Sequence, residues 1–203
     1  MRERERGPAR EIETEHYEAQ QGHQGCVVWL TGLSAAGKST IATHVARRLF
    51  EEGSHVYVLD GDSLRQGLTR DLGFSPTARE ENIRRAGEVA KLFRRAGFIV
   101  LAAFVSPYRK DRDFVRSILD DGHFIEGYVS ADLDTCIGRD PKGLYKKALQ
   151  GAIPEFTGVS APYEPPLAPE IVLDTTAQSV DQSVHAVIDL LDARGIRKAR
   201  ARG

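Results

Sequence analysis

Short apolar runs alternate with longer amphipathic stretches along most of this 203-residue chain. The apolar runs predict buried strands of a parallel sheet at residues 26–31, 55–60, 98–105, 124–129 and 170–174. Periodic apolar positions predict helices between them, at residues 38–52, 76–96, 109–119, 133–139 and 180–191. This alternation predicts a doubly wound α/β domain that extends over residues 25–195.

Three segments depart from the alternation. Residues 1–24 are polar and charged without periodicity, which predicts an N-terminal arm that is partly disordered, and residues 196–203 form a basic tail. Residues 140–169 are rich in glycine and proline but keep aromatic and basic side chains such as Tyr145 and Phe156. A stretch of this length inside a compact domain is typical of a functional lid, with disorder as the alternative.

Composition excludes several classes of protein. Lys and Arg number 28 against 29 Asp and Glu, so no basic excess favours nucleic acid or an anionic membrane. No apolar run approaches the ~18 residues that span a bilayer, and the charged start lacks the apolar stretch of a secretory signal. Cys26 and Cys136 do not form a disulfide framework and are interpreted as small buried side chains in a reducing compartment. We therefore expect a cytoplasmic protein.

The first predicted strand leads directly into a phosphate-binding loop. Gly32, Gly37, Lys38 and Ser39 fill the pattern G-x-x-x-x-G-K-[ST]. The glycines let backbone N–H groups face phosphate oxygens, Lys38 reaches the β and γ phosphates, and the Ser39 hydroxyl ligates Mg²⁺. Chance would place these four residues together in roughly one chain in a hundred of this length. The motif therefore indicates a nucleoside triphosphate site rather than an ordinary glycine turn.

Polar residues follow the next two predicted strands, at the edge where open parallel sheets bind ligands. The second strand ends at Asp60-Gly61-Asp62, and the third leads to Ser106. A carboxylate beside a phosphate loop can hold Mg²⁺ or accept the proton of an attacking hydroxyl, and we assign this role to Asp62, with Asp60 supporting the turn. The third strand lacks the terminal Asp of ATPase metal sites, and no N-K-x-D guanine-reading tetrad occurs. A small phosphotransferase is favoured over an ATPase motor or a GTPase switch.

Arginines gather around the same predicted edge. Arg65 and Arg79 flank Phe74, where guanidinium groups could bind an anionic substrate in bidentate fashion. Asn82 lies one helical turn beyond Arg79 on the same face, so the two could share a ligand. Position alone leaves core packing and base stacking equally open for Phe74. Arg94 and Arg95, farther along the same predicted helix, are interpreted as part of a face exposed to solvent.

Several of these stretches together resemble the adenylylsulfate kinase (APS kinase) family, from about residue 24 to residue 191. The resemblance is carried, in this order, by residues 25–40, 59–62, 71–75, 81–85, 104–109, 139–148 and 156–166. It implies a P-loop kinase of the stand-alone form. With ATP and Mg²⁺, such an enzyme phosphorylates the 3′-hydroxyl of adenosine 5′-phosphosulfate (APS) to give 3′-phosphoadenosine 5′-phosphosulfate (PAPS) in sulfate activation. Family members are commonly dimers, so we expect a homodimer.

The resemblance also implies roles for individual residues. Asp62 would be the base, Lys38 would act on the transferred phosphoryl group, and Ser106 matches a phosphoserine position, although direct in-line transfer needs no such intermediate. Ser39 and Asp62 would ligate Mg²⁺. The ATP side would comprise Gly32, Leu33, Ser34, Ala35, Ala36, Gly37, Lys38, Ser39, Thr40 and Arg139. The APS side, with two phenylalanines around the adenine, would comprise Asp62, Arg65, Phe74, Arg79, Asn82, Val105, Lys142 and Phe156.

Two alternatives stay open at this point. One is a kinase of the same architecture that acts on a sugar or another nucleotide, and the other is a catalytically silent nucleotide-binding regulator. The chain departs from the family pattern at Ala35, where many members have Gly, and at Ser63, where Asn is frequent. Neither change removes a group with a chemical role, and Lys38, Ser39 and Asp62 are intact, which counts against a silent regulator.

Overall fold

A computed structural model describes residues 11–119 and 122–197 of the chain. Its sheet has five parallel strands in the order β2-β3-β1-β4-β5. The strands are β1 (Cys26–Thr31), β2 (Val56–Asp60), β3 (Ile99–Ala103), β4 (Phe124–Ser130) and β5 (Ile171–Asp174). The helices are α1 (Thr14–Gln21), α2 (Lys38–Glu51), α3 (Gly61–Gln66), α4 (Pro76–Arg95), α5 (Arg109–Ser117), α6 (Leu133–Arg139), α7 (Leu144–Leu149) and α8 (Val180–Ala193). The predicted doubly wound α/β fold is confirmed.

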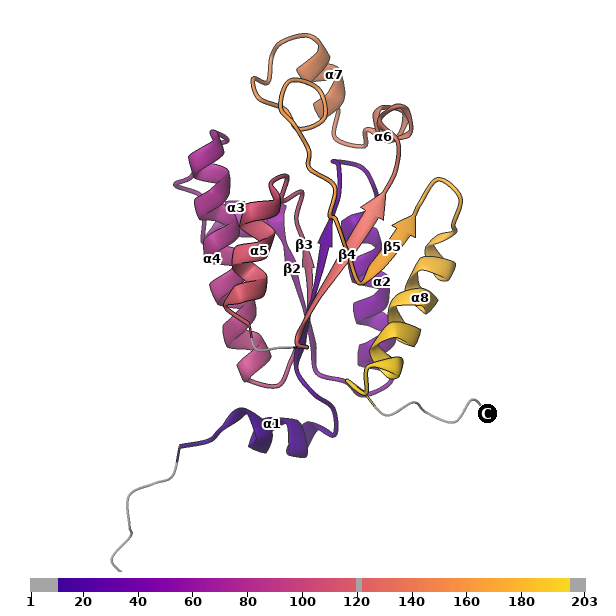
Figure 1. The fold of residues 1–203 in the computed structure, drawn as a ribbon. Coiled ribbons are helices and arrows are strands. Elements are labelled where there is room, and N and C mark those ends of the chain that lie inside the picture. Colours follow the sequence, from indigo (N-terminus) through magenta and orange to yellow (C-terminus); the bar gives the residue numbers. More distant parts are fainter. Residues whose placement is uncertain (1–10, 120–121, 198–203) are drawn as a thin grey trace, which may run out of the picture.

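Two helical layers enclose the sheet (Figure 1): α2 and α8 cover one face, and α4 and α5 cover the other. The central strand β1 is buried along its whole length, as its apolar run predicts. On the α4–α5 side, the rings of Trp29 and Phe104 stack with centroids 4.9 Å apart. Gly87 of α4 lets α5 approach closely, since a Cβ there would lie 2.9 Å from a methyl group of Val115. Apolar packing on both faces thus fixes the strands whose carboxyl ends carry the site.

Helix caps follow the sequence signals. The Ser75 hydroxyl accepts a hydrogen bond from the amide of Ala78 at 3.2 Å, with Pro76 as the first helical residue of α4. Ser179 and Gln182 form a capping box at the start of α8. Ser75 is therefore the cap of α4, and the proline that follows it occupies the position where proline is best tolerated in a helix.

Three helices were not predicted. The first, α1, lies in the predicted arm below the sheet (Figure 1), and the Glu18 side chain accepts a hydrogen bond from the amide of Gly25. The short α3 begins directly after Asp60, and α7 lies within the predicted lid. The first ten residues of the arm and residues 198–203 of the tail lie outside the described residues.

The structure also corrects the prediction for the α4 arginines. Arg94 is 6% exposed, so the interpretation of a solvated face is wrong for this residue. Cys26 and Cys136 are both buried and free, as predicted. Within the described ranges, no helix has the length and apolar character that crossing a membrane requires.

Candidate functional site

A pocket of about 1120 Å³ opens at the carboxyl edge of the sheet. It is bounded by the β1–α2 loop, α3, the first half of α4, residues 103–107, the segment 140–157 and the β5–α8 loop. Sequence-predicted residues that line it are Ser34, Ala35, Gly37, Lys38, Ser39, Thr40, Asp62, Arg65, Phe74, Arg79, Asn82, Val105, Ser106, Arg139, Lys142 and Phe156. Gly32, Leu33 and Ala36 do not line it. The residues that line the pocket thus come from segments along most of the domain, from Ser34 to Ser183.

The phosphate loop has the backbone shape that its sequence predicts. Gly32 is required by close packing, because a Cβ there would lie 2.3 Å from the carbonyl oxygen of Val129. Gly37 caps α2 with φ of 104°, and Ala35 adopts a left-handed φ of 58°, a conformation that glycine adopts more readily. The loop therefore presents the N-terminus of α2 to the pocket, as an anion site requires.

Lys38 is held inside this loop. Its ammonium donates hydrogen bonds to the carbonyl oxygens of Gly32 at 3.0 Å and Leu33 at 2.7 Å. Burial lowers the pKa of Lys38 to about 8. A lysine whose ammonium has lost hydration gains more from an incoming phosphate than an exposed one does.

Two carboxylates lie beside the loop. The Ser39 hydroxyl donates to Asp60 Oδ2 at 2.6 Å, while Asp60 Oδ1 accepts from the amide of Asp62 at 2.9 Å. The predicted role of Asp60 as support of the turn is thus confirmed, and its contact with Ser39 was not foreseen. The Asp62 carboxylate is 64% exposed and pairs with the Lys142 ammonium. The Asp62 carboxylate is therefore accessible from the pocket.

Arginines and a phenylalanine form the opposite wall. Arg65 donates to the carbonyl oxygens of Leu72 and Gly73, each at 3.2 Å, and its guanidinium lies 4.3 Å above the centre of the Phe74 ring. Phe74 is 58% exposed, so it is not a core residue. Arg79 donates to the Phe74 carbonyl oxygen at 2.7 Å. Burial, with repulsion from Arg79 as a smaller cause, lowers the pKa of Arg65. Two guanidinium groups that repel each other on one wall of the pocket favour an anionic ligand.

Asn82 adds an unsatisfied polar group to this wall. The residue is 5% exposed, and its Oδ1 has no hydrogen-bond partner among the described residues. A buried acceptor without a partner is costly, so a donor supplied by a ligand would relieve it. Across the pocket, the ring of Phe156 packs edge-on against Tyr145, with centroids 5.0 Å apart.

The Ser106 hydroxyl is engaged inside the fold. The residue is 2% exposed, has φ of 38°, and its Oγ accepts a hydrogen bond from Trp29 Nε1 at 3.1 Å. Its carbonyl oxygen accepts from Arg112 Nη1 at 2.6 Å. These contacts give Ser106 a defined place in the pocket wall.

Two further residues support the site and were missed. The Thr175 hydroxyl accepts from Arg139 Nη1 and donates to the Ala36 carbonyl oxygen, both at 2.9 Å. Thr175 directly follows β5, so the rule that ligands bind at strand carboxyl ends could have found it. The Tyr145 hydroxyl donates to the Ser34 carbonyl oxygen at 3.1 Å, a contact between residues 111 positions apart that no local pattern reveals.

Comparison with known proteins gives a consistent result. The model of the family described as adenylylsulphate kinase matches residues 24–174. A probable adenylyl-sulfate kinase of Halalkalibacterium halodurans is 59% identical over 171 residues, which are 84% of this chain and 85% of the relative. The adenylyl-sulfate kinase of Geotalea uraniireducens is 54% identical over 186 residues, 92% and 89% of the two chains.

Solved structures agree with these relatives. The Mycobacterium tuberculosis APS kinase in complex with AMPPNP and APS superposes with a TM-score of 0.80 at 44% identity, covering 84% of this chain and 99% of that one. A shikimate kinase from Acinetobacter baumannii has a TM-score of 0.56 at 14% identity, covering 89% and 99%, and is alike in fold alone.

Proposed function

This chain belongs to the adenylylsulphate kinase family, and on that premise we propose how its pocket transfers the γ-phosphoryl group of ATP to the 3′-hydroxyl of APS. The products are PAPS and ADP. One observation carries the proposal. The phosphate loop with Lys38, the Asp62 carboxylate, two arginines and the unsatisfied Asn82 all line the same pocket.

ATP lies along the phosphate loop in this proposal. The backbone N–H groups at the start of α2 and the Lys38 ammonium hold its β and γ phosphates. Arg139, fixed by its bonds to Thr175, borders the base of ATP. Lys38 then stabilises the charge on the phosphoryl group in transfer, and it exchanges its present carbonyl partners for phosphate oxygens.

APS lies between the arginine wall and the segment 140–169. Arg65, Arg79 and Asn82 bind its anionic and polar groups, and Phe74 and Phe156 stack on the two faces of its adenine. Val105 and Lys142 border the same ligand. The exposed ring of Phe74 supports a stacking role, since a core residue would be covered.

The donor set beside the loop fits Mg²⁺. The Ser39 hydroxyl lies 2.6 Å from an Asp60 oxygen, and Asp62 follows two residues later, so the available ligands are hard oxygens. No group of three or more His, Cys, Asp or Glu side chains capable of holding a metal occurs in the part of the chain that the structure describes. Mg²⁺ commonly takes one or two carboxylates and completes its shell with water and phosphate oxygens. We assign Ser39 and Asp62 to it, and it would neutralise charge on the phosphates.

Asp62 accepts the proton of the attacking 3′-hydroxyl. Because Lys142 is paired with this carboxylate, binding of the anionic substrates draws Lys142 toward phosphate or sulfate and frees Asp62 for the hydroxyl. Transfer is direct and in line, and Ser106 shapes the wall without carrying the phosphoryl group.

An ADP-release assay with APS as acceptor tests this function. Wild-type enzyme with ATP and Mg²⁺ should release ADP in proportion to added APS and should yield PAPS. Gluconate and adenosine serve as control acceptors. Turnover with either but not with APS would favour another small-molecule kinase, and ATP binding without transfer to any acceptor would indicate a silent regulator.

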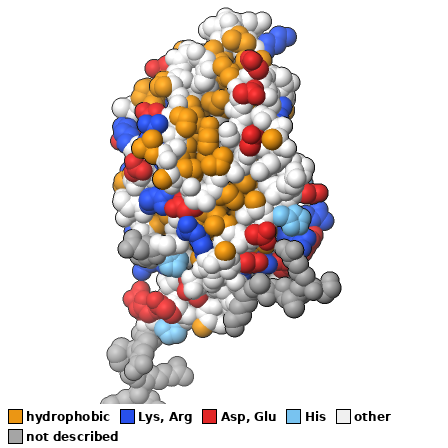
Figure 2. Space-filling view, turned by 45° about the vertical axis from the view of Figure 1, so that its right-hand side comes forward, with side chains coloured by type: hydrophobic (Ala, Val, Ile, Leu, Met, Phe, Trp, Pro, Cys, Tyr) orange, Lys and Arg blue, Asp and Glu red, His pale blue; other side chains and the backbone are white. Residues whose placement is uncertain are grey.

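We also propose a cytoplasmic homodimer. Exposed apolar side chains gather on the face that carries β5 (Figure 2), where Leu167 is 83% and Val172 is 53% exposed. The edge strand β5 can pair with a second copy of the chain. An APS kinase from Thiobacillus denitrificans is described as hexameric, so a relative of this fold also self-associates. Its structure superposes with a TM-score of 0.67 at 33% identity, covering 91% of this chain and 32% of that one. Light scattering of wild type and of Val172→Glu tests this, since only the variant should be monomeric.

A further inference from the structure

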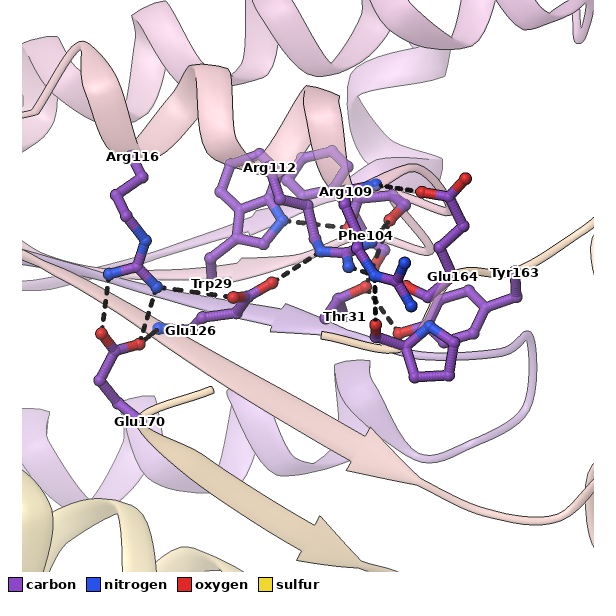
Figure 3. Close-up of polar contacts among 12 residues, drawn as sticks. Trp29, Thr31, Phe104, Arg109, Arg112, Arg116, Glu126, Tyr163, Glu164 and Glu170 are labelled. Carbon is purple, nitrogen blue, oxygen red and sulfur yellow. Dashed lines mark hydrogen bonds and ion pairs between the residues drawn. The ribbon is translucent and has the colours of Figure 1, made fainter. Parts of the chain in front are cut away.

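A buried set of polar contacts lies behind the pocket wall at residues 105–107 (Figure 3). At its centre is Arg112 of α5, which is 2% exposed. Its Nε donates to Glu126 Oε1 at 2.6 Å, its Nη1 to the Ser106 carbonyl oxygen at 2.6 Å, and its Nη2 to the Glu164 carbonyl oxygen at 2.8 Å. One guanidinium therefore holds both the substrate-side wall and the end of the segment 140–169.

Other bonds join the same two parts of the chain. The Glu164 amide donates to the Pro107 carbonyl oxygen, and the Arg109 amide donates to Glu164 Oε2, both at 2.8 Å. The Thr31 hydroxyl donates to the Val105 carbonyl oxygen at 2.8 Å and contacts the Tyr163 hydroxyl at 3.0 Å. The end of the segment is thus fastened to the wall from several sides, through backbone as well as side-chain groups. Its start and middle are joined to the pocket through side chains: Lys142 pairs with the exposed Asp62 carboxylate, the Tyr145 hydroxyl donates to the Ser34 carbonyl oxygen, and Arg79 donates to the Thr157 hydroxyl.

Ser106 needs this support. Its φ of 38° lies in a region that side-chain-bearing residues rarely occupy, and such a conformation persists only where the surroundings determine it strongly. The Trp29 indole holds the Ser106 hydroxyl and Arg112 holds its carbonyl oxygen. Removing the Arg112 bond would free the turn that positions Val105 in the pocket.

Alternating charges keep Arg112 buried as a cation. Glu126 pairs with Arg112, Arg116 approaches Glu126 at 3.5 Å, and Glu170 pairs with Arg116 at 2.7 Å. The Arg112 charge is neutralised from the Nε side, which leaves its Nη groups for the two carbonyl oxygens. Arg116 pairs with carboxylates in the same way, but no hydrogen bond of its guanidinium reaches the wall among the described residues.

We infer that Arg112 is a positioning residue for the acceptor substrate: it fixes residues 105–107 and residues 163–165 as one rigid unit, so that closure over the ligands moves residues 140–162 alone. This inference rests on the proposed function, because the acceptor side of the pocket is assigned there. The ATP side is built by other segments, which Arg112 does not contact through any of its three hydrogen bonds.

Steady-state kinetics of Arg112→Lys and Arg116→Lys test the inference, since each variant keeps a cation in the same helix. Arg112→Lys loses the fork that spans Ser106 and Glu164, so the KM for APS should rise on the order of ten- to a hundredfold. The KM for ATP should change by less than about twofold, and Arg116→Lys should leave both values within that range. Equal effects of the two variants, or an unchanged KM for APS in folded Arg112→Lys, would overturn the inference. If Arg112→Lys does not fold, the double variant Arg112→Gln with Glu126→Gln removes both buried charges and takes its place. Its KM for APS should rise and its KM for ATP should stay within about twofold of wild type, as for the single variant.

Hydrogen exchange of the wild-type enzyme gives an independent result. The Glu164 amide should exchange slowly without ligands and should not slow further when ADP and APS are added. The amides of residues 144–160 should slow when both ligands bind. A Glu164 amide that exchanges as fast as those of residues 144–160 in the free enzyme would contradict the rigid unit. The ligand-free comparison needs no turnover, so absence of APS phosphorylation would defeat the proposed function without altering the expected protection of Glu164.

Discussion

The ammonium of Lys142 lies against the carboxylate of Asp62, a residue 80 positions earlier in the chain. The contact joins the start of the segment 140–169 to the proposed catalytic base. The two side chains are 57% and 64% exposed, and an ion pair between groups so exposed contributes little to stability. Opening this pair therefore costs little, and in the proposed mechanism Lys142 leaves Asp62 for a phosphate or a sulfate, so that substrate binding releases the base.

Asp62→Asn should lower kcat by ~10²–10⁴, the usual contribution of a general base, while ATP binding is largely retained. The amide keeps the shape of the side chain but cannot take the proton, whereas the loop and Lys38 supply most contacts to the triphosphate. Single-turnover rates and calorimetric ATP affinities measure the two effects separately. A normal kcat with lost ATP affinity would show that Asp62 is only a ground-state ligand and that another group is the base.

Lys38→Ala should lower the rate of transfer by ~10²–10³, because the migrating phosphoryl group loses its preorganised cation. Lys147→Ala, which removes an exposed lysine of α7, is the control and should leave kcat unchanged. A Lys38→Ala enzyme with more than half of the wild-type kcat would refute the assignment of the phosphate loop.

The pH dependence of ATP binding follows from the same lysine. Burial lowers the Lys38 pKa to about 8, so the free enzyme increasingly loses this positive charge as the pH rises through 8. A bound triphosphate favours the ammonium, and ATP binding near this pH should therefore take up a proton at Lys38. Calorimetry in two buffers of different ionisation enthalpy measures the uptake, and Lys38→Arg should abolish it.

Ser106→Ala should retain substantial activity, and transfer by the wild-type enzyme from a chiral γ-phosphate should proceed with inversion at phosphorus. The Ser106 hydroxyl is already an acceptor for the Trp29 indole, which supports a structural role. The variant leaves that buried N–H without a partner, so the free energy of unfolding should fall by about 1–3 kcal/mol. An inactive but folded variant, together with net retention in the wild type, would instead establish a phosphoserine route.

The strands and the phosphate loop were predictable because their signals are local. All six residues of β1 are buried, so the apolar run has one simple interpretation, and the loop motif specifies its own backbone shape. No comparable signal marked α1, which has no buried residue and is fixed by contacts such as that of Glu18 with the Gly25 amide. The helix α7 was hidden by the glycines and prolines around it.

Contacts between residues far apart in the sequence limited how much of the site could be predicted. The charge of Arg94 alone suggested that its side chain is exposed to solvent, yet the fold buries this residue. The fold also buries Arg112, because it brings Glu126 and the Glu164 carbonyl oxygen within hydrogen-bond distance of the guanidinium. Which helix face meets which strand depends on packing of the whole domain. The sequence could therefore indicate which residues are chemically suited to the pocket, but not which side chains support them.

Phe156→Ala should weaken binding of APS more than binding of ATP. Stacking of an aromatic side chain on a base contributes ~1–3 kcal/mol, which is on the order of ten- to a hundredfold in affinity. Phe50→Ala, which removes a 73% exposed ring of α2 away from the pocket, is the control for aromatic loss. An unchanged KM for APS together with a lower stability to urea would show that Phe156 serves only to pack against Tyr145.

Asp111→Asn should stabilise the protein at alkaline pH. Asp111 is 4% exposed, and neither carboxylate oxygen has a hydrogen-bond partner among the described residues. Burial raises its pKa to about 6, from an ordinary value of 3.8, although the positive charges of Lys110 and Arg112 act in the opposite direction.

The sign of the effect follows from proton binding. Between about pH 4 and pH 6 the folded state keeps a proton that the unfolded state has released, so the free energy of unfolding falls as the pH rises through this window. Above pH 6 the buried charge is fully present, and Asp111→Asn removes it, so the variant should exceed wild type by about 1–3 kcal/mol at pH 8. At pH 4 the two proteins should be nearly equal. Urea unfolding at both pH values measures the difference, with Asp113→Asn, an exposed carboxylate in the same helix, as the control. A gain that is the same at both pH values would mean that the carboxyl of Asp111 is not the titrating group.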